Sequence, residues 1–171
     1  MVYNKKIMIF AESSYEDLEL WYPKLRLIEE GAEVTVAGTG DKAYKGKNGY
    51  PIEVDGDIKK YKPEDFDALI IPGGWAPDKL RRYNYVLDFV KEMNKQGKVI
   101  AAICHAGWIL ASAGIVKGKK LTCVSAIKDD MINAGAAYEN SEVVVDGNLI
   151  TSRRPSDLPA FCREIIKKLT N

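Results

Sequence analysis

The chain has 171 residues, a mass of 19.0 kDa and a hydrophobic content of 46%, which is typical of one domain, so we expect residues 1–171 to form a single domain. Its 25 basic and 24 acidic side chains give a formal net charge of +1. This balance argues against a general nucleic-acid binder and a polybasic membrane anchor, so we expect neither nucleic acid nor a membrane as partner.

The first half of the chain alternates apolar runs with one helical segment. Residues 7–11 form a continuous apolar run, which is typical of a strand buried on both faces of a parallel sheet. Residues 34–37 are predicted to be the next strand, and residues 38–48 a loop or a peripheral hairpin. The helix predicted between the two strands ends at Gly31, and its apolar residues recur at helical spacing: Leu18, Leu20, Trp21, Leu25, Leu27 and Ile28.

The second half continues the same alternation. Strands are predicted at residues 67–71 and 99–103, and two short strands at 143–150 surround an Asp-Gly turn. Helices are predicted at residues 86–97, 107–113 and 157–169. The alternation predicts a three-layer α/β sandwich of the flavodoxin-like kind, with a mostly parallel sheet and helices on both faces.

The three cysteines, at positions 104, 123 and 162, are odd in number and form no Cys-x-x-Cys pair. We therefore expect free thiols in a reducing compartment. The first apolar run is too short for a signal sequence, which favours a cytoplasmic location. We expect no metal and no cofactor, because the single histidine lacks partners at ligand spacing and no helix follows the Gly-x-Gly motif at residues 38–40.

Cys104 directly follows a predicted strand and directly precedes a predicted helix, so the chain must turn sharply there. Such a turn lifts a side chain out of the sheet at the edge where α/β proteins bind ligands. The positive end of the helix is expected to lower the thiol pKa from its ordinary value of about 8.5. The alternative is a buried cysteine that only fills space.

His105, the only histidine in the chain, is the sequence neighbour of this thiol. Histidine exchanges protons near neutral pH, so a cysteine with a histidine neighbour is the minimum for an activated thiol. A third group usually orients the imidazole. The candidate acids lie near predicted strand ends or on the turns after them: Glu12, Glu16, Asp17 and Asp78.

Residues 72–74, Pro-Gly-Gly, follow another strand of the predicted sheet. Glycine lets a backbone N–H approach a ligand closely, and one such amide together with the His105 N–H is suited to an oxyanion hole. The alternative is a tight turn that needs glycine only for steric reasons.

Several long stretches in register resemble the PfpI branch of the DJ-1/PfpI superfamily. They are residues 15–20, 72–77, 101–105, 112–119 and 127–135, and residues 143–153 and 157–161 continue the resemblance over nearly the whole chain. The resemblance implies a flavodoxin-like sandwich with a nucleophilic thiol at Cys104. Members of the family are described as intracellular cysteine peptidases, and related ones as glyoxalases or deglycases that act on methylglyoxal and its adducts.

The resemblance also implies roles for individual residues. Glu16 matches the family acid whose carboxyl lies against the nucleophile sulfur, and Gly74 and His105 match the oxyanion-hole amides. Asp78 stands where the family has a glutamate that reaches the histidine of a neighbouring subunit. The chain is therefore expected to associate with itself as a homodimer or homohexamer, with the site at the interface.

Two positions depart from the family pattern. Asp78 is one methylene shorter than the family's glutamate, which reduces its reach toward a histidine. Ala106-Gly107-Trp108 stands where the family usually has Gly-Pro after the histidine. We expect Ala106 and Trp108 to shape the substrate pocket, with Trp75 as a further aromatic wall.

The leading hypothesis is a cysteine enzyme without a cofactor. The Cys104 thiolate, supported by the helix start and by Glu16, attacks a small carbonyl compound or a short peptide, while His105 moves the proton. The alternative is a non-enzymatic redox or stress-response protein in which Cys104 is oxidised. A third reading, a flavodoxin-like binding module for nucleotide or flavin, lacks a phosphate-cradling loop.

Overall fold

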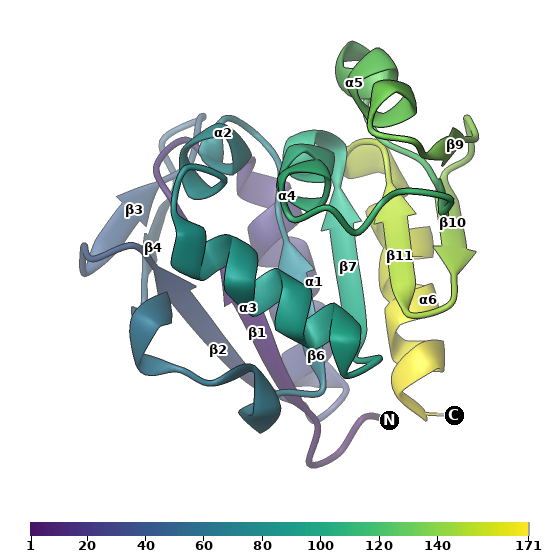
Figure 1. Ribbon diagram of the computed structural model, residues 1–171. Helices are drawn as coiled ribbons and strands as arrows, with labels where there is room; N and C mark the ends of the chain where they lie inside the picture. Colours follow the sequence, from purple (N-terminus) through teal and green to yellow (C-terminus); the bar gives the residue numbers. More distant parts are fainter. Residues whose placement is uncertain (171) are drawn as a thin grey trace.

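A seven-stranded sheet runs through the centre of the molecule, and its strand order is β10-β11-β7-β6-β1-β2-β5. The computed structural model describes residues 1–170 (Figure 1). The chain begins in the middle of the sheet, extends to one edge and then crosses back to build the other half. This arrangement confirms the predicted flavodoxin-like α/β sandwich.

The core strands are parallel and apolar. β1 (Lys6–Phe10) pairs with β2 (Glu33–Gly38) on one side and with β6 (Ala68–Ile71) on the other. β7 (Val99–Ile103) lies between β6 and β11 (Leu149–Ser152). The edges are β5 (Gly56–Asp57), parallel to β2, and β10 (Val143–Asp146), antiparallel to β11. Parallel strands with both faces covered need apolar residues at every position, as the sequence predicted.

Helices cover both faces of the sheet (Figure 1). α1 (Asp17–Glu29) and α6 (Leu158–Thr170) pack on one face, and α3 (Asn84–Lys95) and α4 (Gly107–Ser112) on the other. Two short helices, α2 (Ala76–Leu80) and α5 (Lys128–Asn133), lie near the edge where the parallel strands end. All functional candidates of the sequence lie on segments that meet at this edge.

The smaller elements lie at the periphery. β3 (Ala43–Lys45) and β4 (Pro51–Glu53) form an antiparallel hairpin, which settles the alternative left open for residues 38–48. β8 (Lys120–Leu121) and β9 (Ala137–Tyr138) form a separate parallel pair. Single 3-10 turns span Ile58–Lys60, Pro63–Asp65, Cys104–Ala106, Ser125–Ile127 and Pro155–Asp157.

Helix α1 turns only part of its apolar surface toward the sheet. Leu20 and Leu27 are fully buried, whereas Leu18, Leu25 and Ile28 are exposed. The helical spacing was predicted correctly, but the helix carries two apolar faces.

Among residues 1–170, none of the helices combines the length and hydropathy needed to cross a membrane.

Candidate active site

Cys104 lies at the sharp turn between β7 and α4, as the sequence predicted. Its φ of 62° places a non-glycine residue in the left-handed region, which is uncommon and strained. One 3-10 turn follows before the helix begins at Gly107. Cys104 is 9% exposed, so it lies just beneath the surface at the strand-end edge.

The acidic group beside Cys104 is Glu19, not Glu16. Glu19 is fully buried, and its Oε2 accepts a hydrogen bond of 2.8 Å from the Gly73 N–H. A Cβ placed on Gly73 would lie 2.5 Å from that oxygen and 2.6 Å from the Cys104 Cβ. Because Gly73 has no side chain, the Glu19 carboxyl can approach Cys104.

Glu16, which was expected against the sulfur, instead serves as the N-cap of α1. Its Oε2 accepts a hydrogen bond of 3.1 Å from the Glu19 backbone N–H. A carboxylate in this position satisfies a free amide at the helix start and interacts favourably with the helix dipole. The assignment of the sulfur-contacting acid to Glu16 is therefore wrong by one helical turn.

The carboxyl of Glu19 and the thiol of Cys104 form a coupled pair. Burial, followed by the charge of Glu16, raises the pKa of Glu19 to about 8. The carboxyl is thus protonated at neutral pH, and its buried Oε1 has no hydrogen-bond partner among residues 1–170. When two ionisable groups interact this closely, the pH at which the first proton leaves is a property of the pair and not of either group alone.

The expected low pKa of the Cys104 thiol is not found. Burial, with the negative charge of Glu19 as the second cause, raises the pKa of Cys104 to about 12. Two influences oppose this rise only in part: the backbone amides of His105 and Gly74. Desolvation of a thiolate outweighs the short helix that follows the turn. The sulfur therefore needs a base to take its proton when it attacks.

The two candidate oxyanion amides lie close to the sulfur. The Gly74 and His105 backbone amides both lower the pKa of the Cys104 thiol, which places them against Sγ. Gly74 has a φ of 77° and forms an isolated bridge with Tyr15, and a Cβ there would lie 2.4 Å from the Glu16 backbone nitrogen. Glycine is thus required by both conformation and space.

His105 is positioned to receive the thiol proton. Its Nδ1 lies 3.3 Å from the Cys104 Sγ. Burial, and then the positive charge of Lys47, lowers the pKa of the imidazole. A neutral imidazole is the form that accepts a proton, so this shift suits a general base.

The three residues predicted to shape the pocket lie around His105 and the turn. The ring centroids of Trp75 and Trp108 lie 5.3 Å and 5.0 Å from that of His105. Ala106 is completely buried in the 3-10 turn and presents no surface to a substrate. Trp75 is 57% exposed and is thus available to contact one.

Within residues 1–170, Asp78 makes no hydrogen bond to His105. Its Oδ2 accepts a hydrogen bond of 2.5 Å from Arg82, and both side chains are exposed on and just after α2. A contact between Asp78 and His105 of a neighbouring subunit stays a prediction.

Lys47 is a charged neighbour of the site that no sequence pattern indicated. Its positive charge opposes the rise in the pKa of Glu19 and, after burial, lowers the pKa of His105. The residue lies in the loop between β3 and β4, and its backbone N–H donates to the Tyr15 carbonyl. This backbone contact ties the loop to the segment that precedes α1.

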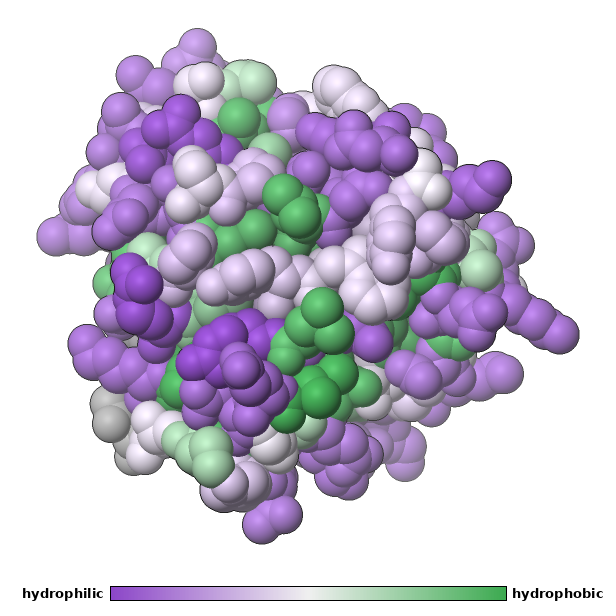
Figure 2. Space-filling view, turned by 180° about the vertical axis from the view of Figure 1, so that it is seen from behind, coloured by the Kyte–Doolittle hydropathy of each residue, from purple (hydrophilic) through white to green (hydrophobic). Residues whose placement is uncertain are grey.

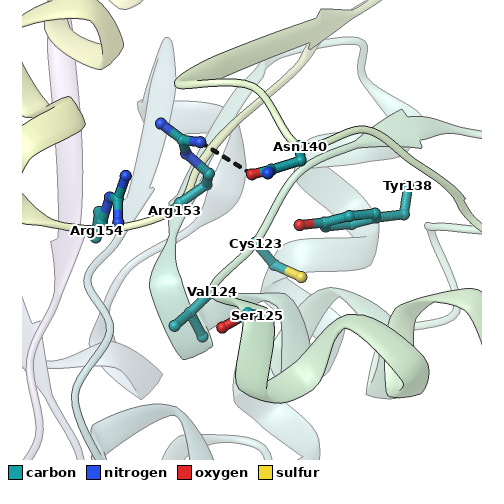
Figure 3. Close-up of a pocket in the computed structure, with 7 residues that line it drawn as sticks. All are labelled: Cys123, Val124, Ser125, Tyr138, Asn140, Arg153 and Arg154. Atoms are coloured by element: carbon teal, nitrogen blue, oxygen red, sulfur yellow. Dashed lines mark hydrogen bonds between the residues drawn. The ribbon is translucent and has the colours of Figure 1, made fainter.

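A separate cavity of about 230 Å³ lies beyond the end of β11 (Figure 3). Cys123 is buried at its wall, and burial raises the pKa of this thiol to about 12. Arg153 in the same wall donates hydrogen bonds to Asp157 and Asn140, the latter marked in Figure 3. The cavity contains none of the predicted catalytic residues.

Gly73→Ala is expected to lower activity at least about a hundredfold, because the new methyl group displaces the Glu19 carboxyl from Cys104. The crowding should also destabilise the fold by about 1–3 kcal/mol. Turnover and urea unfolding measure the two effects. Gly97→Ala is the control for strain without crowding: its φ of 67° strains an alanine, but no atom lies within 4 Å of the new Cβ, so it should lose some stability and keep turnover. Wild-type turnover in Gly73→Ala would contradict the placement of Glu19.

Known proteins resemble this chain in sequence and in fold. The model of the "DJ-1/PfpI family" matches residues 5–168. The chain is 45% identical to "Deglycase PfpI" of Pyrococcus furiosus over 96% of this chain and 99% of that protein. It is 41% identical to "Protein/nucleic acid deglycase 2" of Escherichia coli, over 97% of this chain and 98% of that protein. The crystal structure of Drosophila melanogaster DJ-1beta is 32% identical, with a TM-score of 0.91 over 96% of this chain and 90% of that one.

Proposed function

Because the chain belongs to the DJ-1/PfpI family, we propose that it is a cysteine-dependent deglycase that acts on methylglyoxal adducts. The observation that carries the proposal is the arrangement at Cys104. A strained turn presents the thiol, Glu19 adjoins it, and the Nδ1 of His105 lies 3.3 Å from Sγ. Peptide hydrolysis uses the same nucleophile and is the second activity to test.

In the proposed first step, Sγ of Cys104 forms a bond to the substrate carbonyl carbon. The thiol proton passes to Nδ1 of His105, and the electron pair of the carbonyl π bond moves to oxygen. In this proposal the Gly74 and His105 backbone amides, which both lower the pKa of the Cys104 thiol, stabilise that oxyanion. General base catalysis of this kind contributes about 10²- to 10⁴-fold.

The substrate is tested by mixing the protein with N-acetylarginine or N-acetylcysteine that has been treated with methylglyoxal. Release of the free amino acid and of lactate, which is methylglyoxal plus water, supports the proposal. A fluorogenic peptide is assayed in parallel. Cleavage of the peptide without loss of the adduct would replace the deglycase assignment by a peptidase.

The redox alternative finds less support in the structure. Susceptibility of a cysteine to oxidation follows its thiolate character and its exposure. Cys104 is 9% exposed, and burial raises its pKa to about 12. Mass spectrometry after mild peroxide treatment distinguishes the two functions, because selective and stable oxidation of Cys104 in a protein without turnover would favour a redox role.

We also propose that the protein associates with itself through the outer face of α1. Figure 2 shows the side of the molecule opposite to that of Figure 1, where hydrophobic side chains gather between polar ones. Leu18 and Leu25 are each 57% exposed, and with Trp21 and Tyr50 they line an apolar hollow. Exposed apolar surface of this kind favours association. A neighbouring subunit is the proposed source of the acid that contacts His105.

Leu25→Glu is expected to convert the oligomer into a monomer, because it places a charge in the centre of the proposed interface. Sedimentation velocity measures the change, with Lys60→Glu, on a different exposed segment, as control. Turnover should fall with the oligomer. A monomeric variant that keeps full activity would remove Asp78 from the mechanism.

We propose that the protein acts in the cytoplasm. Cys104, Cys123 and Cys162 are all free thiols, and a reducing compartment keeps cysteines in that state. Fractionation of cells that express the protein tests this location, and recovery in a secreted or membrane fraction would contradict it.

A further inference from the structure

Trp108, near the start of α4, joins the catalytic histidine to two other helices. Its ring centroid lies 5.0 Å from that of His105, with 56° between the ring planes. Its indole N–H donates a hydrogen bond of 2.8 Å to Oδ2 of Asp130 in α5. The guanidinium of Arg81, at the end of α2, lies 5.6 Å from the centre of the indole. The indole is therefore fixed by groups other than His105.

Arg81 is held in turn by a hydrogen bond. Its Nε donates to Oγ of Ser112, at the end of α4, over 2.9 Å. α2, α4 and α5 thus converge on one indole. Trp75 also contacts the imidazole, but it is 57% exposed and its side chain makes no hydrogen bond within residues 1–170, so it is the less constrained of the two indoles.

A histidine that transfers protons needs a fixed ring orientation, which a hydrogen-bonded carboxylate commonly provides. Within residues 1–170, the only hydrogen-bonding contact of the imidazole is with the Cys104 Sγ. Asp78, the candidate acid, pairs with Arg82 instead. Within one subunit, the orientation of the ring must therefore come from packing.

We propose that Trp108 positions the imidazole of His105 against the Cys104 thiol, and that Asp130 is a positioning residue that acts through Trp108. The effect of this positioning on catalysis rests on the proposed function. The Asp130 carboxylate fixes the indole N–H, and the indole face then restricts rotation of the imidazole. Without that hydrogen bond the indole turns, and Nδ1 spends less time facing Sγ.

Activity measurements separate this role from that of a substrate-binding wall. Asp130→Ala and Trp108→Phe both remove the hydrogen bond, and each should lower kcat about three- to tenfold with KM unchanged. Asp130→Asn keeps an oxygen that accepts from the indole and should retain wild-type kcat. Asp129→Ala is the control, because its carboxylate makes no hydrogen bond to Trp108 within the described chain. The double variant Trp108→Phe with Asp130→Ala should lose no more than either single variant.

A second readout does not require turnover. His105 is the only histidine in the sequence, so its ring nitrogens give one assignable set of NMR signals, which report the tautomer ratio. We expect the ratio to change in Trp108→Phe and Asp130→Ala and to stay at the wild-type value in Asp130→Asn and Asp129→Ala. If no substrate is turned over, the NMR result still tests the positioning role. An unchanged ratio in Asp130→Ala, or a change in KM alone, would overturn the proposal.

Discussion

Replacement of Cys104 by alanine is expected to lower turnover of the methylglyoxal adduct by at least about a thousandfold. The sulfur forms the bond to the carbonyl carbon in the proposed mechanism, and no other described nucleophile adjoins the imidazole. Cys123 and Cys162 are buried elsewhere, and burial raises the pKa of each to about 12.

The control for this prediction is Cys162→Ala, which removes a buried thiol from α6 and should retain turnover. Steady-state kinetics with the purified variants measure the effect, and circular dichroism confirms that both are folded. Turnover in Cys104→Ala within about tenfold of the wild type would exclude covalent catalysis by this residue.

Glu19→Gln is expected to stabilise the fold above pH 8. The pKa of Glu19 is raised from 4.5 to about 8 in the folded protein, so the folded state binds the proton more tightly than the unfolded state does. Below pH 4.5 both states are protonated, and the wild type then loses stability as the pH rises from 4.5 to 8. The total loss is about 5 kcal/mol in order of magnitude. Glutamine does not titrate and is free of this loss.

Urea unfolding of the wild type and of Glu19→Gln at pH 5 and pH 8.5 measures this effect. The stability difference between the two proteins should shift in favour of the variant by several kcal/mol between these pH values. Glu53→Gln, an exposed position on β4, is the control and should follow the wild type. Parallel curves for all three proteins would show that the Glu19 carboxyl is not held protonated.

The sequence predicted the sheet better than its periphery. Continuous apolar runs identified the buried central strands because both faces of a parallel sheet are covered. The two-residue strands β5, β8 and β9 and the short helices α2 and α5 were missed, since two to six residues show no measurable periodicity. The exposed leucines of α1 follow the same spacing as its buried ones, so periodicity alone did not reveal the second apolar face.

In the candidate site, the residues that are neighbours in the sequence could be predicted, whereas those brought in from other segments could not. Cys104 and His105 could be predicted because the strand, the turn and the helix around them are consecutive in the sequence. Glu16 and Glu19 lie one helical turn apart, and the choice between them depends on which carboxylate caps the helix. The side chain of an N-cap residue accepts a hydrogen bond from a backbone N–H of the helix, so it is not free to contact the sulfur. This favours Glu19 as the acid beside Cys104. Lys47 comes from a distant loop and has no local signal.

We expect the Cys104 thiol and the Glu19 carboxyl to titrate as one pair. The rate of Cys104 alkylation with iodoacetamide, followed by mass spectrometry from pH 5 to pH 10, measures this titration. In the wild type we expect the rate to rise through a transition near pH 8, where the pair loses its first proton, and we expect this transition to be absent in Glu19→Gln. Identical profiles in the two proteins, or a rate at Cys104 no higher than at Cys123 and Cys162, would contradict the account.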